Sequence, residues 1–186
     1  NSVGKEAYQT LEQTGADMLR ALAIYLGLDE NYFDPHIHNG NSILRPIHYP
    51  PITDEPKDAV RAAQHEDINL ITLLMGASAE GLEILNKQNE WVAVTALPGQ
   101  IIVNVGDMLQ RHTNNQLRST THRVVNPPRE KWGESRFSIP FFLHPRSEMP
   151  LDCLPQCIDE KHPKQYEDMT AGEYLNERLQ EIGLKK

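Results

Sequence analysis

His65 and Asp67 stand two residues apart, directly before an apolar run that ends at Leu74. Residues i and i+2 of a strand project to the same face. A strand that begins at His65 would therefore present the imidazole and the carboxylate side by side, with Glu66 on the opposite face. An imidazole and a carboxylate are two ligands for a divalent metal ion. A third ligand must come from another segment of the chain.

His122 is the expected third ligand, because it lies in a second strand-like run over residues 119–125. Two histidines and one carboxylate on one face leave coordination positions open, as in the facial triad of non-haem Fe(II) oxygenases. Zinc hydrolases also bind their metal through two histidines and a carboxylate, so a zinc site is an alternative at this point.

Arg136 and Ser138 form the only Arg-x-Ser in the chain, again inside a strand-like run. A guanidinium beside a hydroxyl on one strand face can bind a carboxylate group. Zinc hydrolysis would not require such a receptor. Each of these short motifs is weak evidence alone, but the three together, in this order and in β context, are much more specific.

The elements that must position these residues are mostly short strands separated by turn signals. Apolar or alternating runs cover residues 43–49, 68–75, 82–85, 91–97, 101–105, 120–125 and 137–143. This pattern predicts an all-β sandwich or barrel, with one helical turn at residues 107–111. An amphipathic helix is expected over residues 8–26. The capping box of Thr170 and Glu173 predicts a last helix that stops near Gly183.

Composition excludes several classes of protein. The chain has 186 residues, one domain's worth, with 18 Lys and Arg against 26 Asp and Glu and a net charge of −8. An acidic chain without a basic cluster is not expected to bind nucleic acid, and no run approaches the roughly 18 apolar residues of a membrane span. Cys153 and Cys157 are expected to be free thiols in a reducing cytoplasm. The oligomeric state cannot be read from this pattern.

The chain resembles the isopenicillin N synthase-like group of Fe(II)- and 2-oxoglutarate-dependent oxygenases. Besides the motifs above, the matching stretches are Leu44-Arg45, His48 to Pro51, Gly81 to Leu85, Trp91-Val92, Leu97 to Gly99, Val103 to Gln110 and Thr113-Asn114. The resemblance implies a double-stranded β-helix (jelly-roll) barrel with flanking N- and C-terminal helices. It implies one catalytic domain over residues 1–186, with a helical lead-in at 1–41, a jelly-roll core at 42–145 and a C-terminal loop and helix at 146–186.

The resemblance also implies a role for each motif residue. His65, Asp67 and His122 would bind Fe(II), and Arg136 and Ser138 would hold the distal carboxylate of 2-oxoglutarate. With O2, such an enzyme hydroxylates or desaturates a small organic substrate and releases succinate and CO2. The substrate itself cannot be read from the residues.

Five further positions follow from the same resemblance. Tyr49 would line the cosubstrate or substrate end of the pocket, whereas Ile47 replaces a family asparagine, so one cosubstrate hydrogen bond is in question. Asn104, Gly106 and Asp107 are expected to be structural, with Gly106 providing backbone freedom and Asp107 capping a helix.

Alternatives stay open beside this hypothesis. Isopenicillin N synthase and the aminocyclopropane-carboxylate oxidases keep the same motifs without using 2-oxoglutarate, so an oxidase of that kind, or an ascorbate-dependent one, is the second hypothesis. A non-catalytic, metal-binding jelly-roll fragment is the third. Family members carry a further N-terminal region, which we expect to be missing from a chain that starts at Asn1. An edge of the sheet would then be exposed and would invite dimerisation.

Overall fold

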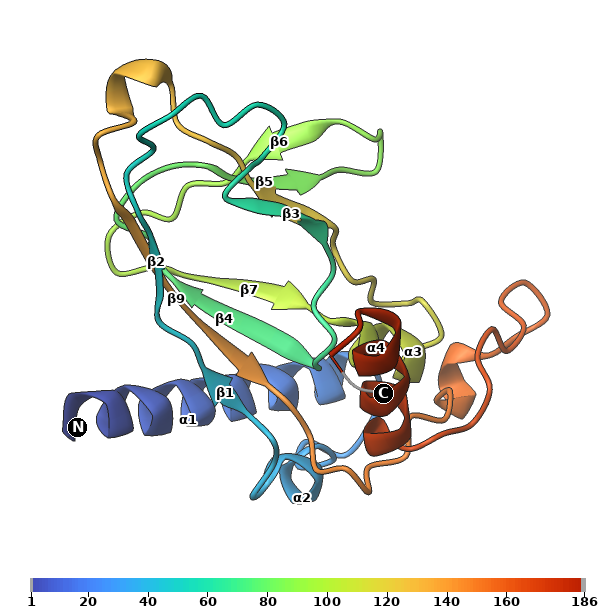
Figure 1. The fold of residues 1–186 in the computed structure, drawn as a ribbon. Coiled ribbons are helices and arrows are strands. Elements are labelled where there is room, and N and C mark those ends of the chain that lie inside the picture. The colour runs from blue at the N-terminus through green and yellow to red at the C-terminus, as the bar shows by residue number, and fades with distance from the viewer. Residues whose placement is uncertain (1, 185–186) are drawn as a thin grey trace.

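Two antiparallel sheets face each other in the computed structural model, which describes residues 2–184 (Figure 1). In the larger sheet, strand β9 pairs on one side with β1 and β2 and on the other with β4, which pairs with β7. These strands are β1 (Ile43–Leu44), β2 (Ile47–Tyr49), β4 (Ile71–Met75), β7 (Ile101–Val105) and β9 (Arg136–Leu143). The smaller sheet has the order β3 (Ala62–His65), β8 (His122–Val124), β5 (Leu82–Leu85) and β6 (Trp91–Ala93). The mainly antiparallel β architecture is therefore confirmed.

Helices flank the larger sheet, as expected. Helix α1 (Ser2–Tyr25) runs across the outer face of this sheet, and α3 (Asp107–His112) and α4 (Ala171–Glu181) lie beyond one end of it (Figure 1). Helix α2 (Asp34–Ile37) and the 3-10 turns Arg129–Lys131 and Pro155–Cys157 are short. The predicted capping box is present, since the Thr170 side chain accepts from the Glu173 N–H and the Glu173 carboxylate accepts from the Thr170 N–H.

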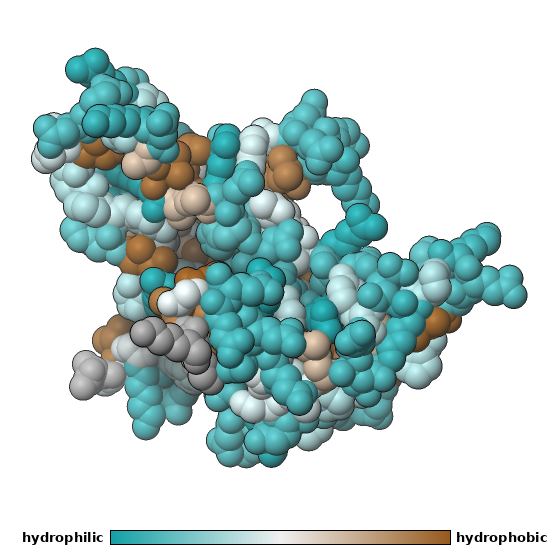
Figure 2. All heavy atoms as spheres, turned by 45° about the vertical axis from the view of Figure 1, so that its right-hand side comes forward, coloured by the Kyte–Doolittle hydropathy of each residue, from teal (hydrophilic) through white to brown (hydrophobic). Residues whose placement is uncertain are grey.

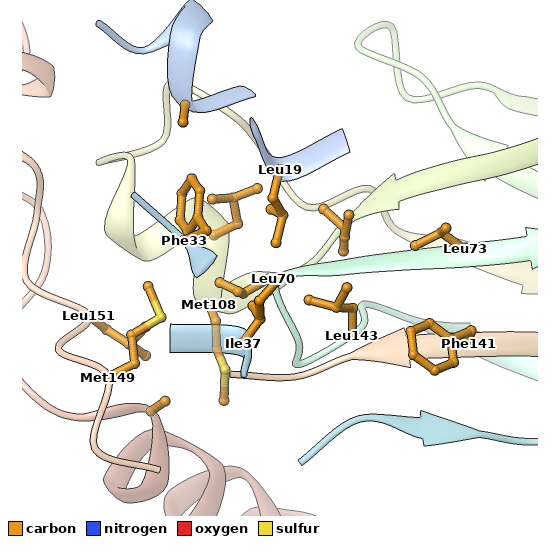
Figure 3. Close-up of a cluster of buried hydrophobic side chains, with 14 of the residues drawn as sticks. Leu19, Phe33, Ile37, Leu70, Leu73, Met108, Phe141, Leu143, Met149 and Leu151 are labelled. Carbon is orange, nitrogen blue, oxygen red and sulfur yellow. The ribbon is translucent and has the colours of Figure 1, made fainter. Parts of the chain in front are cut away.

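The main hydrophobic core lies between the larger sheet and the flanking helices. Leu73 on β4 is opposite Phe141 on β9, and both side chains are fully buried. Figure 3 shows Leu19 of α1 and Met108 of α3 in the same cluster. This core occupies the helix side of the sheet, so the opposite face of β4 and β9 is available for polar groups.

The expected strand over residues 43–49 is interrupted, and Pro140 explains the interruption. The Arg45 N–H donates to the Pro140 carbonyl, but proline has no N–H to complete the pair with the Arg45 carbonyl. Pro46 follows directly, so pairing with β9 stops after Leu44 and resumes at Ile47. The two pieces, β1 and β2, keep a common partner strand.

His65 and Asp67 do not begin one continuous strand, so the sequence prediction of a strand running on from His65 is wrong. His65 ends β3 in the smaller sheet, whereas β4 begins at Ile71 in the larger sheet, so Asp67 lies in the crossing segment. This segment is held by the start of α3. The Gly106, Asp107 and Met108 N–H groups donate to carbonyls of residues 67–70. Strand β3 has no apolar alternation, and the sequence pattern did not indicate it.

Two expectations about α3 are also wrong. Gly106 has a φ of −101°, which any residue can adopt, and Asp107 is the first helical residue rather than a side-chain cap. Glycine is required because a Cβ at position 106 would lie closer than 3.0 Å to Asn69 backbone and side-chain atoms. Close approach of two backbones, rather than backbone freedom, therefore explains this residue.

Surface features agree with the composition. Figure 2 shows hydrophilic residues over most of the face it presents, with smaller hydrophobic areas between them. Among residues 2–184, no helix is both long and apolar enough to cross a membrane. Cys153 and Cys157 are buried free thiols.

Candidate metal centre and anion pocket

His65, Asp67 and His122 converge although each comes from a different element. Strands β3 and β8 pair with His65 opposite His122, and the crossing segment brings the Asp67 carboxylate to the same point. One ligand atom of each residue lies within 4.8 Å of the other two. Asp67 Oδ1 is 3.9 Å from His65 Nε2 and 3.7 Å from His122 Nε2. The three side chains could thus hold one divalent metal ion.

Both imidazole rings are oriented by the backbone just before them. The Nδ1 atom of His65 is 2.7 Å from the Ala63 carbonyl, and that of His122 is 3.0 Å from the Thr120 carbonyl. A carbonyl only accepts, so each Nδ1 carries a proton, and the neutral form of each ring keeps its lone pair on Nε2. Each Nε2 faces Asp67, which is the arrangement that a metal ligand requires.

The Asp67 carboxylate is buried and is held through one oxygen only. Oδ2 accepts from the Thr72 hydroxyl at 2.7 Å and from the Asn104 amide at 3.4 Å. The Thr72 hydroxyl in turn accepts from the Asn69 amide at 2.9 Å. These bonds leave Oδ1 free toward the two histidines, so the carboxylate is positioned as the third ligand.

The second polar group of the site consists of Arg136 and Ser138, at the start of β9. Tyr49 and Ile47 on β2 are opposite Arg136 and Ser138 on β9, respectively. Arg136 is 2% exposed, its Nε donates to the Ala79 carbonyl at 3.1 Å and its guanidinium lies over the Tyr49 ring, 5.1 Å from the ring centroid. Its Nη1 is enclosed and has no hydrogen-bond partner, and burial lowers the pKa of the guanidinium. An anionic partner at Nη1 would offset the cost of burying this charge.

One cavity of about 450 Å³ joins the two groups. Its lining contains every residue that the sequence singled out as a ligand: Tyr49, His65, Asp67, His122, Arg136 and Ser138. Thr72, which bonds to Asp67, is opposite Phe142, whereas Arg136 is the first residue of β9, so the two groups lie toward opposite ends of that strand. Apolar side chains such as Leu74 and Ile84 form other parts of the wall.

The sequence pattern missed several polar residues of this cavity. Thr72 sits inside an apolar strand run and Asn104 is expected only to be structural, and the structure adds that both donate hydrogen bonds to Asp67. Spacing could not have indicated these contacts, since Thr72 and Asn104 become neighbours only when β4 pairs with β7. Arg61, which precedes β3 and also lines the cavity, carried no motif that could have indicated it.

Comparison with known protein families gives a match that covers the whole of this site. Residues 31–145 match the model of the 2OG-Fe(II) oxygenase superfamily. The match includes both histidines, the aspartate and the Arg-x-Ser pair.

Individual relatives agree with this match. The 2-oxoglutarate-Fe(II) type oxidoreductase hxnY of Emericella nidulans is 33% identical over 180 residues, which are 91% of this chain and 50% of that protein. A candidate 2OG-Fe(II) oxygenase family protein from Caulobacter crescentus is 48% identical, with a TM-score of 0.88 over 96% of this chain and 58% of that one. A full-length Neurospora crassa protein, solved in complex with alpha-KG and thymine, is 32% identical, with a TM-score of 0.87 over 95% of this chain and 55% of that one.

These likenesses have two consequences. The structural neighbours are oxygenases of the double-stranded β-helix type, so the predicted jelly-roll fold with flanking helices is confirmed. The chain spans about half the length of the curated relatives it matches.

Proposed function

Because this chain belongs to the 2OG-Fe(II) oxygenase superfamily, we propose that it provides the iron- and 2-oxoglutarate-binding part of a dioxygenase that oxidises a small organic molecule. The observation that carries the proposal is the single cavity in which a His–Asp–His group and a buried, unpaired arginine face the same space. Iron bound there would support the reaction of O2 with 2-oxoglutarate, which gives succinate and CO2 and oxidises the substrate.

The proposed iron ligands are His65 Nε2, Asp67 Oδ1 and His122 Nε2. Three ligands on one side leave the other positions to 2-oxoglutarate and O2, which is the property that separates this donor set from a closed structural site. The chain's own contribution is to fix both imidazole tautomers and the carboxylate before a metal arrives. Little rearrangement is then needed on binding.

Arg136 and Ser138 are the proposed contacts of the distal carboxylate of 2-oxoglutarate. A buried guanidinium without an acidic partner is costly, and an incoming carboxylate would offset this cost while the Ser138 hydroxyl donates to it. Ile47 lies directly opposite Ser138 and its side chain has no polar atom, so the loss of one family hydrogen bond stays a prediction. Tyr49 would close the pocket over Arg136.

The substrate is proposed to be a small, partly apolar molecule that enters beside His65, whose side chain is 47% exposed. The apolar wall that includes Leu74, Ile84 and Ile102 supports this class. Hydroxylation is the reaction we propose, with desaturation as the second outcome. Among the relatives, the Neurospora crassa protein was crystallised with thymine, a compact ring of this size class. The cytoplasmic location and the absence of nucleic-acid partners stay predictions.

The decisive experiment is an anaerobic titration of the Fe(II)-loaded protein with 2-oxoglutarate. A visible metal-to-ligand charge-transfer band is expected to develop, and Arg136→Ala should weaken 2-oxoglutarate binding at least tenfold. Arg146→Ala, which removes an exposed arginine outside the cavity, is the control and should leave the titration unchanged. Iron bound in stoichiometric amount with no band would overturn the 2-oxoglutarate assignment and favour an oxidase that does not use it.

A further inference from the structure

Three arginines line the cavity that holds Arg136, the other two being Arg45 and Arg61, and of these two only Arg61 has an enclosed donor without a hydrogen-bond partner. We propose that Arg61 is a further contact of the distal carboxylate of 2-oxoglutarate, acting together with Arg136 and Ser138. This inference rests on the proposed function and extends it by one residue. It assigns a role to a side chain that lies outside the His-x-Asp, His and Arg-x-Ser motifs.

The guanidinium of Arg61, like that of Arg136, is held by one hydrogen bond to a backbone carbonyl. Its Nη2 donates to the Glu134 carbonyl at 3.0 Å, which holds the guanidinium in place, and its Nε is enclosed without a hydrogen-bond partner. Arg136 likewise donates from Nε to a backbone carbonyl and leaves Nη1 enclosed and unpaired. One cavity wall thus contains two guanidinium groups, each with a buried donor that lacks an acceptor.

The charges of the two arginines are not balanced by the protein. Among residues 2–184, no aspartate or glutamate forms an ion pair with Arg61 or Arg136. Both guanidinium groups line the same cavity, and burial lowers the pKa of Arg136, with Tyr49 opposing this effect and the like charge of Arg61 adding to it. An anion between them would relieve both the repulsion and the missing acceptors.

Arg61 also marks where the cosubstrate cavity ends. With Leu82 and Val94 it lines both this cavity and a neighbouring one of about 580 Å³. Three glutamates, Glu80, Glu83 and Glu134, line the neighbouring cavity and outnumber its one lysine, Lys131, whereas Asp67 is the only acidic residue of the described chain in the lining of the cosubstrate cavity. An anion is therefore favoured on the Arg136 side of Arg61 and disfavoured on the other side.

The test compares two 2-oxo acids that differ at the distal end. 2-Oxoglutarate and 2-oxobutanoate share the group that would chelate iron, but 2-oxobutanoate has no distal carboxylate. Dissociation constants for both are measured anaerobically with the Fe(II)-loaded protein from the charge-transfer band. Arg61→Gln should weaken 2-oxoglutarate binding roughly tenfold and leave 2-oxobutanoate binding within about twofold, while Arg61→Lys should show an intermediate loss.

Two results would overturn the inference alone. One is unchanged 2-oxoglutarate binding in both Arg61 variants, and the other is an equal loss for the two 2-oxo acids, which would indicate a structural role. Arg146→Gln serves as the matched control. If Arg61→Gln does not fold, Arg61→Lys carries the comparison by itself. Absence of the band in the unsubstituted protein, with iron bound, would overturn the proposed function and this inference together.

Discussion

Thr72 is the residue on which the proposed aspartate ligand depends most directly. Its hydroxyl donates to Asp67 Oδ2 at 2.7 Å, so Thr72→Val would remove this bond and leave a buried carboxylate oxygen with one weak contact from Asn104. We expect Thr72→Val to lower Fe(II) affinity about 10- to 100-fold without unfolding the protein. Thr72→Ser keeps the hydroxyl and should bind nearly as the original does. Calorimetric Fe(II) titration measures both, and equal affinity in all three proteins would contradict the prediction.

His112 should make the stability of the fold depend on pH, separately from the proposed site. Its Nδ1 faces the Asp152 carbonyl at 2.7 Å and its Nε2 faces the Tyr32 hydroxyl at 2.9 Å. Burial lowers the pKa of His112 from 6.5 to about 4, although the bond to Asp152 opposes this effect. The folded protein therefore binds this proton less readily than the unfolded chain.

The stabilisation from neutral His112 is fully present above pH 6.5 and is lost as the pH falls toward 4. The loss should be about 3 kcal/mol of unfolding free energy for this one group. Urea unfolding at several pH values should show a smaller acid-side slope in His112→Asn. His38→Asn, which changes an exposed histidine, should keep the slope of the original protein. An unchanged slope in His112→Asn would contradict the assignment.

At the scale of single residues, the sequence indicated the candidate ligands but not the residues that hold them in place or lie beside them. His65, Asp67, His122, Arg136 and Ser138 belong to short motifs, and the structure brings all of them into one cavity. Their roles as ligands stay predictions. Thr72 and Arg61 could not be recognised from spacing, because their importance comes from contacts between segments that only the fold brings together.

At the scale of single elements, the start of α3 holds the segment that carries Asp67, and Gly106 allows the two backbones to approach each other. A Cβ at this position would overlap with Asn69, and the backbone of residues 106–108 bonds to the segment that carries Asp67. Gly106→Ala should therefore lower the unfolding free energy by roughly 1–3 kcal/mol, and it should also weaken metal binding, since Asp67 must shift. Chemical denaturation checks the first effect and Fe(II) titration the second.

Gly133→Ala is the matched control for this prediction. Nothing lies within 4 Å of a Cβ at Gly133, and its φ is not in the left-handed region. Its unfolding free energy should stay within about 0.5 kcal/mol of the original. If both alanine variants behaved alike, the close approach at Gly106 would not be the reason for this glycine.

Element boundaries could be predicted where local chemistry sets them, as at the Thr170 capping box. They could not be predicted where a partner strand sets them. The break between β1 and β2 follows from Pro140, a residue about a hundred positions away, and strand β3 forms only because β8 pairs with it. Apolar alternation cannot reveal a strand whose residues are held by backbone pairing alone.

At the scale of the whole molecule, β7 is an open edge of the larger sheet within residues 2–184. Ile101 on this strand is 39% exposed and Val103 is 37% exposed, on the same face of the sheet as Leu73 of β4 and Phe141 of β9, which are fully buried. Unpaired edge strands with exposed apolar side chains readily pair with another chain. We expect this chain, on its own, to associate with itself as its concentration rises.

Sedimentation velocity over a range of concentrations measures this association. Ile101→Lys should shift the equilibrium toward the monomer at least tenfold, because a charge on an edge strand opposes pairing. Leu97→Lys removes a 62% exposed leucine from a loop and should have little effect. A monomer at every concentration would show that the edge is protected in another way.

The carbonyl groups that orient His65 and His122 come from the residues two positions earlier, Ala63 and Thr120. A main-chain carbonyl is present whichever amino acid occupies the position, so substitutions at 63 and 120 leave this acceptor in place. The carboxylate, in contrast, depends on the side chains of Thr72 and Asn104. Over evolutionary time, sequence drift should therefore be tolerated beside both histidines and selected against around Asp67, and a designer moving this centre to another barrel could copy each histidine as a three-residue unit.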